Sequence, residues 1–477
     1  MYRFPLFRYL PYLPYLHYLP YLLHPLLLPP SPVLRYPSPM QPLSPLDGRY
    51  ASKVNALRPF FTEDALIRAR IFVEVSYLGA LADEKGITEL KPLASRQKKS
   101  LQDIVDKFDE KEAAKVREIE KVTNHDVKAV EYYLRKVLER IGGAKMKTEF
   151  LHFALTSEDV NNLANGILIQ DALRRVLKPE LQALIANMRS LAAPHMNRRI
   201  LSLTHGQPAT PTTLGKEIMV FVTRLEKQRD LLTRFKMDGK FGGAVGNYFA
   251  HRAAYPDFNW EAFGRKFVRS LKLEPLKFTT QINPHDDLAE LSHIYVRINT
   301  ILVGLARDIW MYISRGIFKQ QVVKGEVGSS TMPHKVNPID FENAEGNLGL
   351  SSALFDHFAL KLPISRLQRD LSDSTVQRNI GVAFGYHLLS LQSLRKGLKK
   401  LSVDKEFISG ELHLHPEVLG EAIQTVLRKN GVTDAYEKIK ALTRGKRLSL
   451  EALESLVKNL DINRADKAQL LKLIDTF

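Results

Sequence analysis

Cysteine is absent from the 477 residues of this chain. Its absence excludes disulfides, thiolate metal sites, iron–sulfur clusters and cysteine nucleophiles. A reducing compartment is compatible with such a composition, and the cytoplasm is the expected location. Few segments alternate apolar and polar residues between turn signals, and no Gly-rich phosphate loop follows a plausible strand. Both observations disfavour nucleotide-binding α/β folds.

Residues 1–39 lack Asp, Glu and Lys and repeat the phrase Tyr-Leu-Pro-Tyr-Leu. The recurrent prolines would break a helix, so neither a membrane span nor a signal-peptide core fits this stretch. We expect a low-complexity, disordered extension, and an organelle transit peptide is the alternative. The composition changes at Met40, which we expect to begin the functional protein.

The formal net charge of +17 favours anionic partners. Lys and Arg are spread along the chain, with only short clusters at 96–99 and 444–447, so a dedicated nucleic-acid arm is not expected. Small anionic substrates and a solvated basic face are the preferred interpretation, with neither nucleic acid nor a membrane as partner.

Helical periodicity dominates from about residue 50 onward. Leu181, Leu184, Ile185, Met188 and Leu191 form one stripe between Pro179 and Pro194, which predicts a core-facing helix. A second stripe over 294–312 has apolar residues on its flanks as well, which predicts a helix buried inside a bundle. The fold class is therefore predicted to be all-α.

A chain of this length is expected to form more than one domain. The central stretch has the strongest helical period, while both flanks are more charged, so boundaries are placed near 145 and 400. Four parts follow: the extension (1–39), an N-terminal helical domain (40–145), a central bundle carrying a distinctive loop (146–399), and a short C-terminal helical domain (400–477).

That loop, Gly328 to Pro338, is rich in hydroxyl and amide side chains. Successive backbone N–H groups together with Lys335 and Asn337 suit a carboxylate whose charge grows as a neighbouring carbon is deprotonated. A polar surface turn is the alternative. The other glycine-rich segment, 242–247, is expected to serve tight backbone packing or a turn. Dinucleotide binding is not expected of it, because no strand is predicted before it.

The loop resembles the signature loop of the fumarase/aspartase superfamily, whose members release fumarate by cleaving C–N or C–O bonds. Three further segments resemble the adenylosuccinate lyase family of the bacterial type: 123–128 (TNHDVK), 156–159 (TSED) and 204–210 (THGQPAT). The resemblance runs from about Ser44 to about Arg447. It implies a three-domain fold with a long central bundle, and a homotetramer whose active sites are shared between subunits.

The resemblance also implies β-elimination of fumarate from two succinylated purine-pathway nucleotides, adenylosuccinate and succinylaminoimidazole carboxamide ribotide, with no cofactor and no metal. Another fumarate-releasing lyase, such as argininosuccinate lyase, and a non-catalytic structural reuse of the fold are the alternatives. A requirement for a 5′-phosphate would distinguish the first of these.

Such an elimination needs a base, an acid and binding groups for carboxylates and a phosphate. By resemblance Ser329 is the base, His205 is the acid and Glu342 orients His205. The implied substrate-binding residues are Arg49, Tyr50, Asn124, His125, Asp126, Thr156, Ser157, Gln281, Ser330, Lys335, Asn337, Asn343, Arg369, Ser374, Thr375 and Arg378. The phosphate end of the nucleotide site is implied to be formed by Arg49, Tyr50, Arg369, Ser374, Thr375 and Arg378, and guanidinium groups suit phosphate oxygens. Thr156 and Ser157 also resemble a helix start.

Overall fold

A computed structural model describes residues 42–142, 148–325, 328, 330–445 and 448–477. The expected extension 1–39, the expected start at Met40 and the predicted base Ser329 lie outside the described residues.

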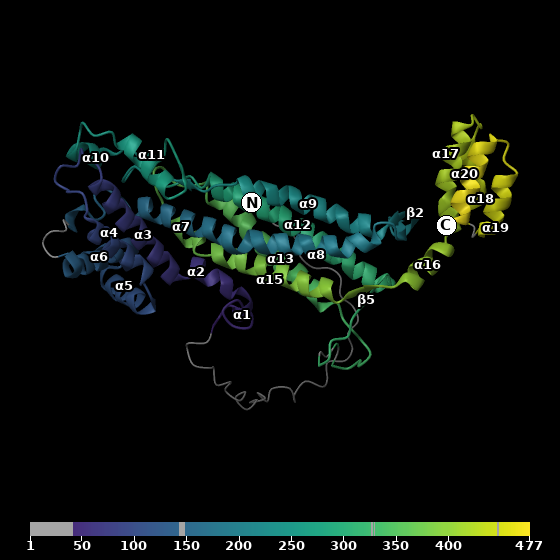
Figure 1. The fold of residues 1–477 in the computed structure, drawn as a ribbon, viewed down its shortest axis with the longest axis horizontal. Coiled ribbons are helices and arrows are strands. Elements are labelled where there is room, and N and C mark those ends of the chain that lie inside the picture. The colour runs from purple at the N-terminus through teal and green to yellow at the C-terminus, as the bar shows by residue number, and fades with distance from the viewer. Residues whose placement is uncertain (1–41, 143–147, 326–327, 329, 446–447) are drawn as a thin grey trace, which may run out of the picture.

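The first described segment is a helical region, of which α3 to α6 lie at one end of an elongated molecule (Figure 1). Its helices are α1 (Ala51–Val54), η1 (Asn55–Leu57), α2 (Arg58–Phe61), α3 (Glu63–Ala82), α4 (Ser95–Asp106), α5 (Glu110–Thr123) and α6 (Asp126–Gly142). Thr62 and Asp109 cap α3 and α5 by accepting hydrogen bonds from Ala65 N–H and Glu112 N–H.

Long helices form the centre of the molecule: α7 (Ser157–Ala172), α8 (Lys178–Ala192), α9 (Leu214–Arg234), α12 (Asp286–Arg315), α13 (Ile339–Lys361) and α15 (Ile380–Lys399). Five of them close a bundle, because α12 packs on α13, α13 on α15, α15 on α8, α8 on α9 and α9 on α12. A π-helical segment, η4 (Leu173–Leu177), joins α7 to α8.

Shorter elements connect and extend the bundle. They are η3 (Thr148–Phe150), η5 (Ala193–His195), α10 (Phe249–Ala254), α11 (Trp260–Ser270), α14 (Ser372–Gln377), α16 (Lys405–His413), η6 (Pro416–Leu419), α17 (Gly420–Lys429), α18 (Ala435–Thr443), α19 (Leu450–Lys458) and α20 (Arg464–Asp475). Helices α17 to α20 gather at the end of the bundle opposite α3 to α6 (Figure 1).

Three two-stranded sheets complete the described fold. An antiparallel hairpin is formed by β1 (Arg199–Thr204) and β2 (Gln207–Thr213), β3 (Asp238–Gly239) is parallel to β4 (Glu274–Pro275), and β5 (Phe318–Gln320) is antiparallel to β6 (Leu401–Val403).

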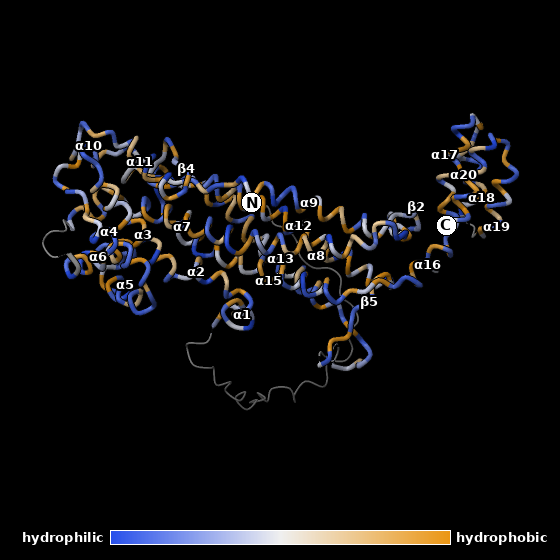
Figure 2. Tube along the Cα trace, in the orientation of Figure 1, coloured by the Kyte–Doolittle hydropathy of each residue, from blue (hydrophilic) through white to orange (hydrophobic). Residues whose placement is uncertain are grey.

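Both predicted helices and the predicted all-α class are confirmed. Helix α8 buries Leu181, Leu184, Ile185 and Met188, and it begins beside Pro179. Helix α12 buries residues on several faces, as expected for a helix inside a bundle. Apolar and polar residues are interspersed along these helices (Figure 2), and none of the described helices is both long and apolar enough to cross a membrane.

His387 is fully buried in this helical core and makes the free energy of unfolding depend on pH. His387 lies on α15, where its Nδ1 is 2.7 Å from the Asn299 amide oxygen and its ring packs edge-on against Tyr295. Burial lowers the pKa of His387 to about 3. The folded protein therefore keeps this ring neutral, while an unfolded chain protonates it below its ordinary pKa of 6.5.

The free energy of unfolding is predicted to include a His387 contribution that is complete above pH 6.5 and is lost as the pH falls toward about 3. The slope is about 1.4 kcal/mol per pH unit. His387→Asn keeps a donor for Asn299 but does not titrate. Between pH 7 and pH 5, wild type should therefore lose about 2 kcal/mol more than the variant in urea unfolding. The exposed His413→Asn is the control, and a His387→Asn variant with the wild-type pH slope would contradict the prediction.

Candidate active site

Helix α7, the first of the long central helices along the chain, begins among predicted substrate-binding residues. Helix α7 starts at Ser157, and the Thr156 N–H donates to the Asp159 carboxylate at 2.8 Å. The helix start anticipated from the sequence is therefore confirmed. Ser157 Oγ lies 3.5 Å from His125 Nε2, which brings two predicted substrate-binding residues from separate segments together.

The 123–128 segment forms the corner between α5 and α6. Asn124 ends α5 in the left-handed region, with φ of 49°. Asp126 accepts from Arg70 at 2.6 Å and lies 3.8 Å from Arg378. Burial raises the pKa of the Asp126 carboxyl, but the Arg70 charge and a backbone N–H from Val127 outweigh it and lower the net pKa. Asp126 is therefore an anion that holds two guanidinium groups in place.

Asp159 connects this helix start to the glycine-rich segment. Its carboxylate accepts from Lys240 Nζ at 2.6 Å and from the Gly242 and Gly243 N–H groups at 2.9 and 3.0 Å. Gly243 and Gly246 have φ of 78° and 74°, which confirms the predicted turn. The expectation that no strand precedes it was wrong, because the two-residue strand β3 ends at Gly239. The turn also accepts a hydrogen bond at Ala244 O from Gln281, another predicted binding residue.

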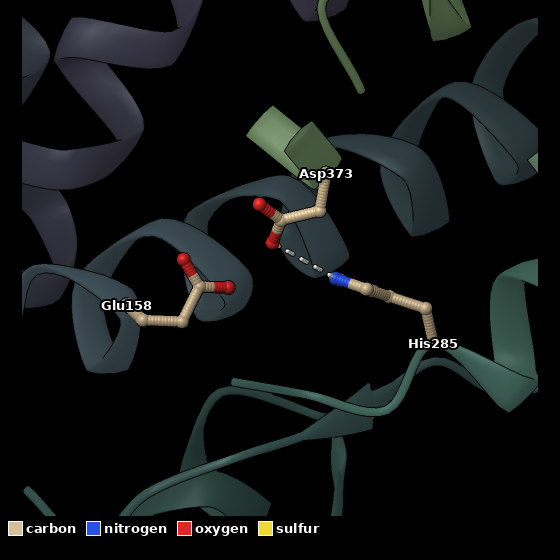
Figure 3. Close-up of side chains that lie close together, drawn as sticks. All are labelled: Glu158, His285 and Asp373. Atoms are coloured by element: carbon tan, nitrogen blue, oxygen red, sulfur yellow. Dashed lines mark ion pairs between the residues drawn. The ribbon is translucent and has the colours of Figure 1, made fainter. Parts of the chain in front are cut away.

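A buried polar cluster lies next to this turn. Figure 3 shows the Glu158 side chain from α7 facing His285 and Asp373. His285 Nε2 is 3.8 Å from the Asp373 carboxylate, and Arg369 Nη1 is 3.1 Å from Asp373 and 3.4 Å from Glu158. The predicted phosphate ligand Arg369 is thus already paired with two carboxylates, and phosphate binding by it stays a prediction.

The two carboxylates of the cluster differ in acidity. Burial raises the pKa of Glu158 to about 7, partly offset by the charges of His285 and Arg369. For Asp373, burial acts in the same direction, but the adjacent His285 ring and the Arg369 charge lower the net pKa. Glu158 therefore exchanges a proton near neutral pH while Asp373 stays ionised, the division found where one acid and one base share a site.

Glu158, His285 and Asp373 also have the donor atoms of a metal site, since one ligand atom from each lies within 4.8 Å of the others. A guanidinium already occupies the cation position between the carboxylates, through the Arg369 contacts given above. The donor set therefore fits an internal ion-pair network better than it fits a divalent cation.

A small cavity of about 90 Å³ lies beside the cluster. Its lining includes Glu158 and the predicted residues Asp126, Ser374 and Arg378, so predicted residues from two distant segments share one pocket. Arg378 Nη1 donates to both carboxylate oxygens of Glu63 at 3.1 Å. Thr375 is exposed on α14, and its carbonyl accepts from Asn379.

The predicted signature loop lies at the other end of the bundle, where α13 begins. Asn337 Nδ2 donates to Gly328 O at 2.7 Å and closes the loop. Only glycine fits at position 328, because an added Cβ would lie 1.8 Å from the Lys335 carbonyl oxygen. Ser330 and Lys335 are exposed, and the predicted base Ser329 is outside the described residues.

Two more predicted residues, Glu342 and Asn343, lie in α13 shortly after this loop. Asn343 Nδ2 lies 3.4 Å from the Tyr50 hydroxyl, and the Arg49 guanidinium carbon lies 5.9 Å from the Tyr50 ring centre. Glu342, in the first turn of α13, accepts from Trp310 Nε1 at 3.1 Å. Among the described contacts none joins Glu342 to His205, so their pairing within one chain has no support and stays a prediction.

His205 occupies the tip of the β1–β2 hairpin. Thr204 pairs with Gln207, which leaves His205 and Gly206 as a two-residue loop with φ of 52° and 73°. Positive φ at both positions is typical of a type I′ turn, which fixes the twist of the hairpin. The loop presents His205 to solvent, where its imidazole is accessible to a substrate or to another subunit.

Helix α12 separates the residues around α7 from the His205 hairpin. His285 immediately precedes its first turn, whereas Arg315 in its last turn donates to Leu201 O of the hairpin. Thirty residues of α-helix span about 45 Å. The residues around α7 and the His205 tip are therefore too far apart to contact one small molecule within a single chain.

Sequence reasoning did not identify His285 and Asp373 as site residues, and it treated Glu158 only as part of a helix start. The three lie far apart in the chain and share no spacing motif. An Asn-Pro-His-Asp-Asp stretch at 283–287 was the one local signal available for His285.

Comparison with known families gives two matches that together span most of the chain. Residues 48–350 match the family described as "Lyase", and residues 365–476 match "Adenylosuccinate lyase C-terminal". A fumarate lyase structure from Mesorhizobium sp. BNC1 is similar in fold, with a TM-score of 0.68, 17% identity, and coverage of 88% of this chain and 94% of that one.

Curated relatives are much more similar in sequence. An adenylosuccinate lyase of Legionella pneumophila (strain Corby) is 51% identical, covering 90% of this chain and 94% of the relative. That of Escherichia coli (strain K12) is 48% identical, covering 91% and 95%. The site segments predicted from resemblance lie within the matched regions, and the chain belongs to the adenylosuccinate lyase family.

Proposed function

We propose that this protein eliminates fumarate from adenylosuccinate to give AMP, and from succinylaminoimidazole carboxamide ribotide to give the aminoimidazole carboxamide ribotide. The observation that carries this proposal is the convergence around the start of α7. His125, Ser157, Gln281, Arg369, Ser374 and Arg378 come from distant segments and meet within a network of direct contacts and one small cavity.

The chemistry of this region suits the nucleotide and one carboxylate of such a substrate. A guanidinium group can donate two parallel hydrogen bonds to two oxygens of one phosphate. The Arg378 side chain is half exposed beside the cavity. Thr156 and Ser157 offer hydroxyls at a helix start, where the helix dipole favours an anion. The loop residues Ser330, Lys335 and Asn337 would bind the succinyl carboxylates.

Proton transfer is assigned to Ser329 and to His205 at the tip of the β1–β2 hairpin. Ser329 would take the Cβ proton of the succinyl group, and His205 would protonate the departing purine nitrogen as the C–N bond breaks. A serine hydroxyl is a poor base unless its oxyanion is stabilised, and backbone amides with Lys335 in the same loop would provide that stabilisation. Glu342 would orient the His205 ring from a neighbouring chain.

The distance along α12 supports a shared site. We infer a homotetramer in which the α7 region, the His205 hairpin and the 328–338 loop of each active site come from different subunits. Exposed apolar side chains on the bundle helices, such as Val220, Met311 and Leu350, suit burial between subunits. The absence of cysteine supports our further proposal of a cytoplasmic location.

Ser329→Ala and His205→Ala are each predicted to lower kcat by about 10²–10⁴-fold while the KM for adenylosuccinate changes little. Each removes one proton-transfer group and leaves the charged binding groups in place. Fumarate release followed by absorbance measures both constants. His413→Ala, an exposed histidine on α16, is the control. A variant that retains more than about a tenth of wild-type kcat, a loss below ~1.4 kcal/mol, would refute its assigned role.

Mixing Ser329→Ala with His205→Ala should restore activity after the two variants exchange subunits. Some sites in a mixed oligomer would take an intact His205 from one subunit and an intact Ser329 from another. Each variant mixed with itself should stay inactive. Hetero-oligomers verified by differential tagging that show no activity would contradict the shared site.

Arg378→Ala is predicted to raise the KM for adenylosuccinate by at least about tenfold, with kcat within a few-fold of wild type. The change removes a guanidinium from the phosphate-binding cavity but no proton-transfer group. A substrate without the 5′-phosphate should be a poor substrate for wild type and should be affected little by the substitution. Arg366→Ala, on the same connection but highly exposed, is the control. Equal activity toward both substrates would favour a sister lyase.

A further inference from the structure

A large cavity among the described residues is separate from the site discussed above. It has a volume of about 680 Å³, within the range of about 300–1,000 Å³ that is typical of ligand pockets. It lies between the N-terminal helices α3 and α4 and the η4 junction of the bundle. No residue assigned to the active site from the sequence is part of its described lining.

Positive charge dominates one part of the lining. Five cationic side chains face two carboxylates: the cations are Arg68, Arg174, Arg175, Lys178 and Lys272, and the acids are Asp106 and Asp171. Asp171 is shared between Arg174 at 2.9 Å and Arg175 at 3.5 Å, and Asp106 accepts a hydrogen bond from Gln102. Within the described contacts no acid pairs with Arg68, Lys178 or Lys272.

This concentration of charge is large enough to disturb its own members. Burial and the neighbouring Arg174 charge lower the pKa of Lys178. Cations that lie close together with too few carboxylates to neutralise them repel one another, and a bound polyanion stabilises them by neutralising their charge. The lining therefore favours a ligand with several negative charges.

Most of the remaining lining is apolar or aromatic, apart from Gln102, Gln170 and Ser270. Phe60, Phe72 and Phe235 contribute rings, and Leu168 and Leu173 add aliphatic surface. A planar base can stack on or pack against such side chains while a phosphate chain reaches the cations. A simple inorganic polyanion would leave this apolar half unused.

The backbone at the cavity is also unusual. Arg174 and Arg175 lie in η4, a π-helical segment. Such insertions are rare and occur frequently at functional sites. Phe60 and Leu168 line both this cavity and the small cavity of the active site, so the two spaces are neighbours with a common wall.

We propose that this cavity is a second ligand site that binds a nucleoside triphosphate, with its phosphates on the Arg68, Arg174, Arg175, Lys178 and Lys272 cluster and its base against the phenylalanine rings. The site is separate from the one that binds the substrate.

The test is ATP binding to the intact protein by calorimetry, in the presence of saturating AMP to occupy the substrate site. Arg175→Glu combined with Lys178→Glu should raise the Kd for ATP at least tenfold. Lys227→Glu, an exposed lysine on α9 outside the cavity, is the matched control and should leave the Kd within twofold. Arg68→Glu with Lys272→Glu tests the same cluster from other elements if the first pair destabilises the fold.

Adenosine and tripolyphosphate separate the two halves of the proposed ligand, and each should bind at least tenfold more weakly than ATP. Unchanged fumarate release by the charge-reversal variants would show that they are folded. No ATP binding beside AMP, unchanged binding by both charge-reversed pairs, or tripolyphosphate binding as tight as ATP would each overturn the proposal. Binding is measured directly, so its failure is distinguishable from a failure of the proposed reaction.

Discussion

Lys240 and Asp159 form an ion pair with both side chains fully excluded from solvent. Burying two charges is costly unless their remaining hydrogen bonds are satisfied, and here the backbone satisfies them. The Asp159 carboxylate accepts from Thr156, Gly242 and Gly243, while Lys240 Nζ also donates to Gly243 O at 2.7 Å. The start of α7, the glycine turn and, through Ala244, Gln281 are therefore fixed by one network.

The length of the bundle determines what one chain can do. Helix α12 places the residues around α7 at one end and the His205 hairpin at the other (Figure 1). A rigid separation of about 45 Å suits a site assembled from several copies, because copies packed antiparallel would bring opposite ends of the bundle together. In the proposed oligomer, each chain would supply part of an active site and its neighbours would supply the rest.

Local pattern made part of this structure predictable from the sequence. Helices α8 and α12 follow from apolar stripes, and the helix start at Thr156 and Ser157 follows from residue type. The His205 hairpin does not, because β1 and β2 lack clean alternation of buried and exposed residues. The Glu158, His285 and Asp373 cluster depends on tertiary packing of distant segments, and so does the engagement of Arg369 with it. Resemblance identified residue types for the site, but it carried no information on which atoms already pair within one chain.

The central claim is that this chain releases fumarate from adenylosuccinate, and incubation of the purified wild-type protein with that nucleotide tests it most directly. Fumarate and AMP should appear in equal amounts, without added metal or cofactor, as the absorbance of adenylosuccinate falls. A folded, oligomeric preparation that leaves adenylosuccinate intact would contradict the account.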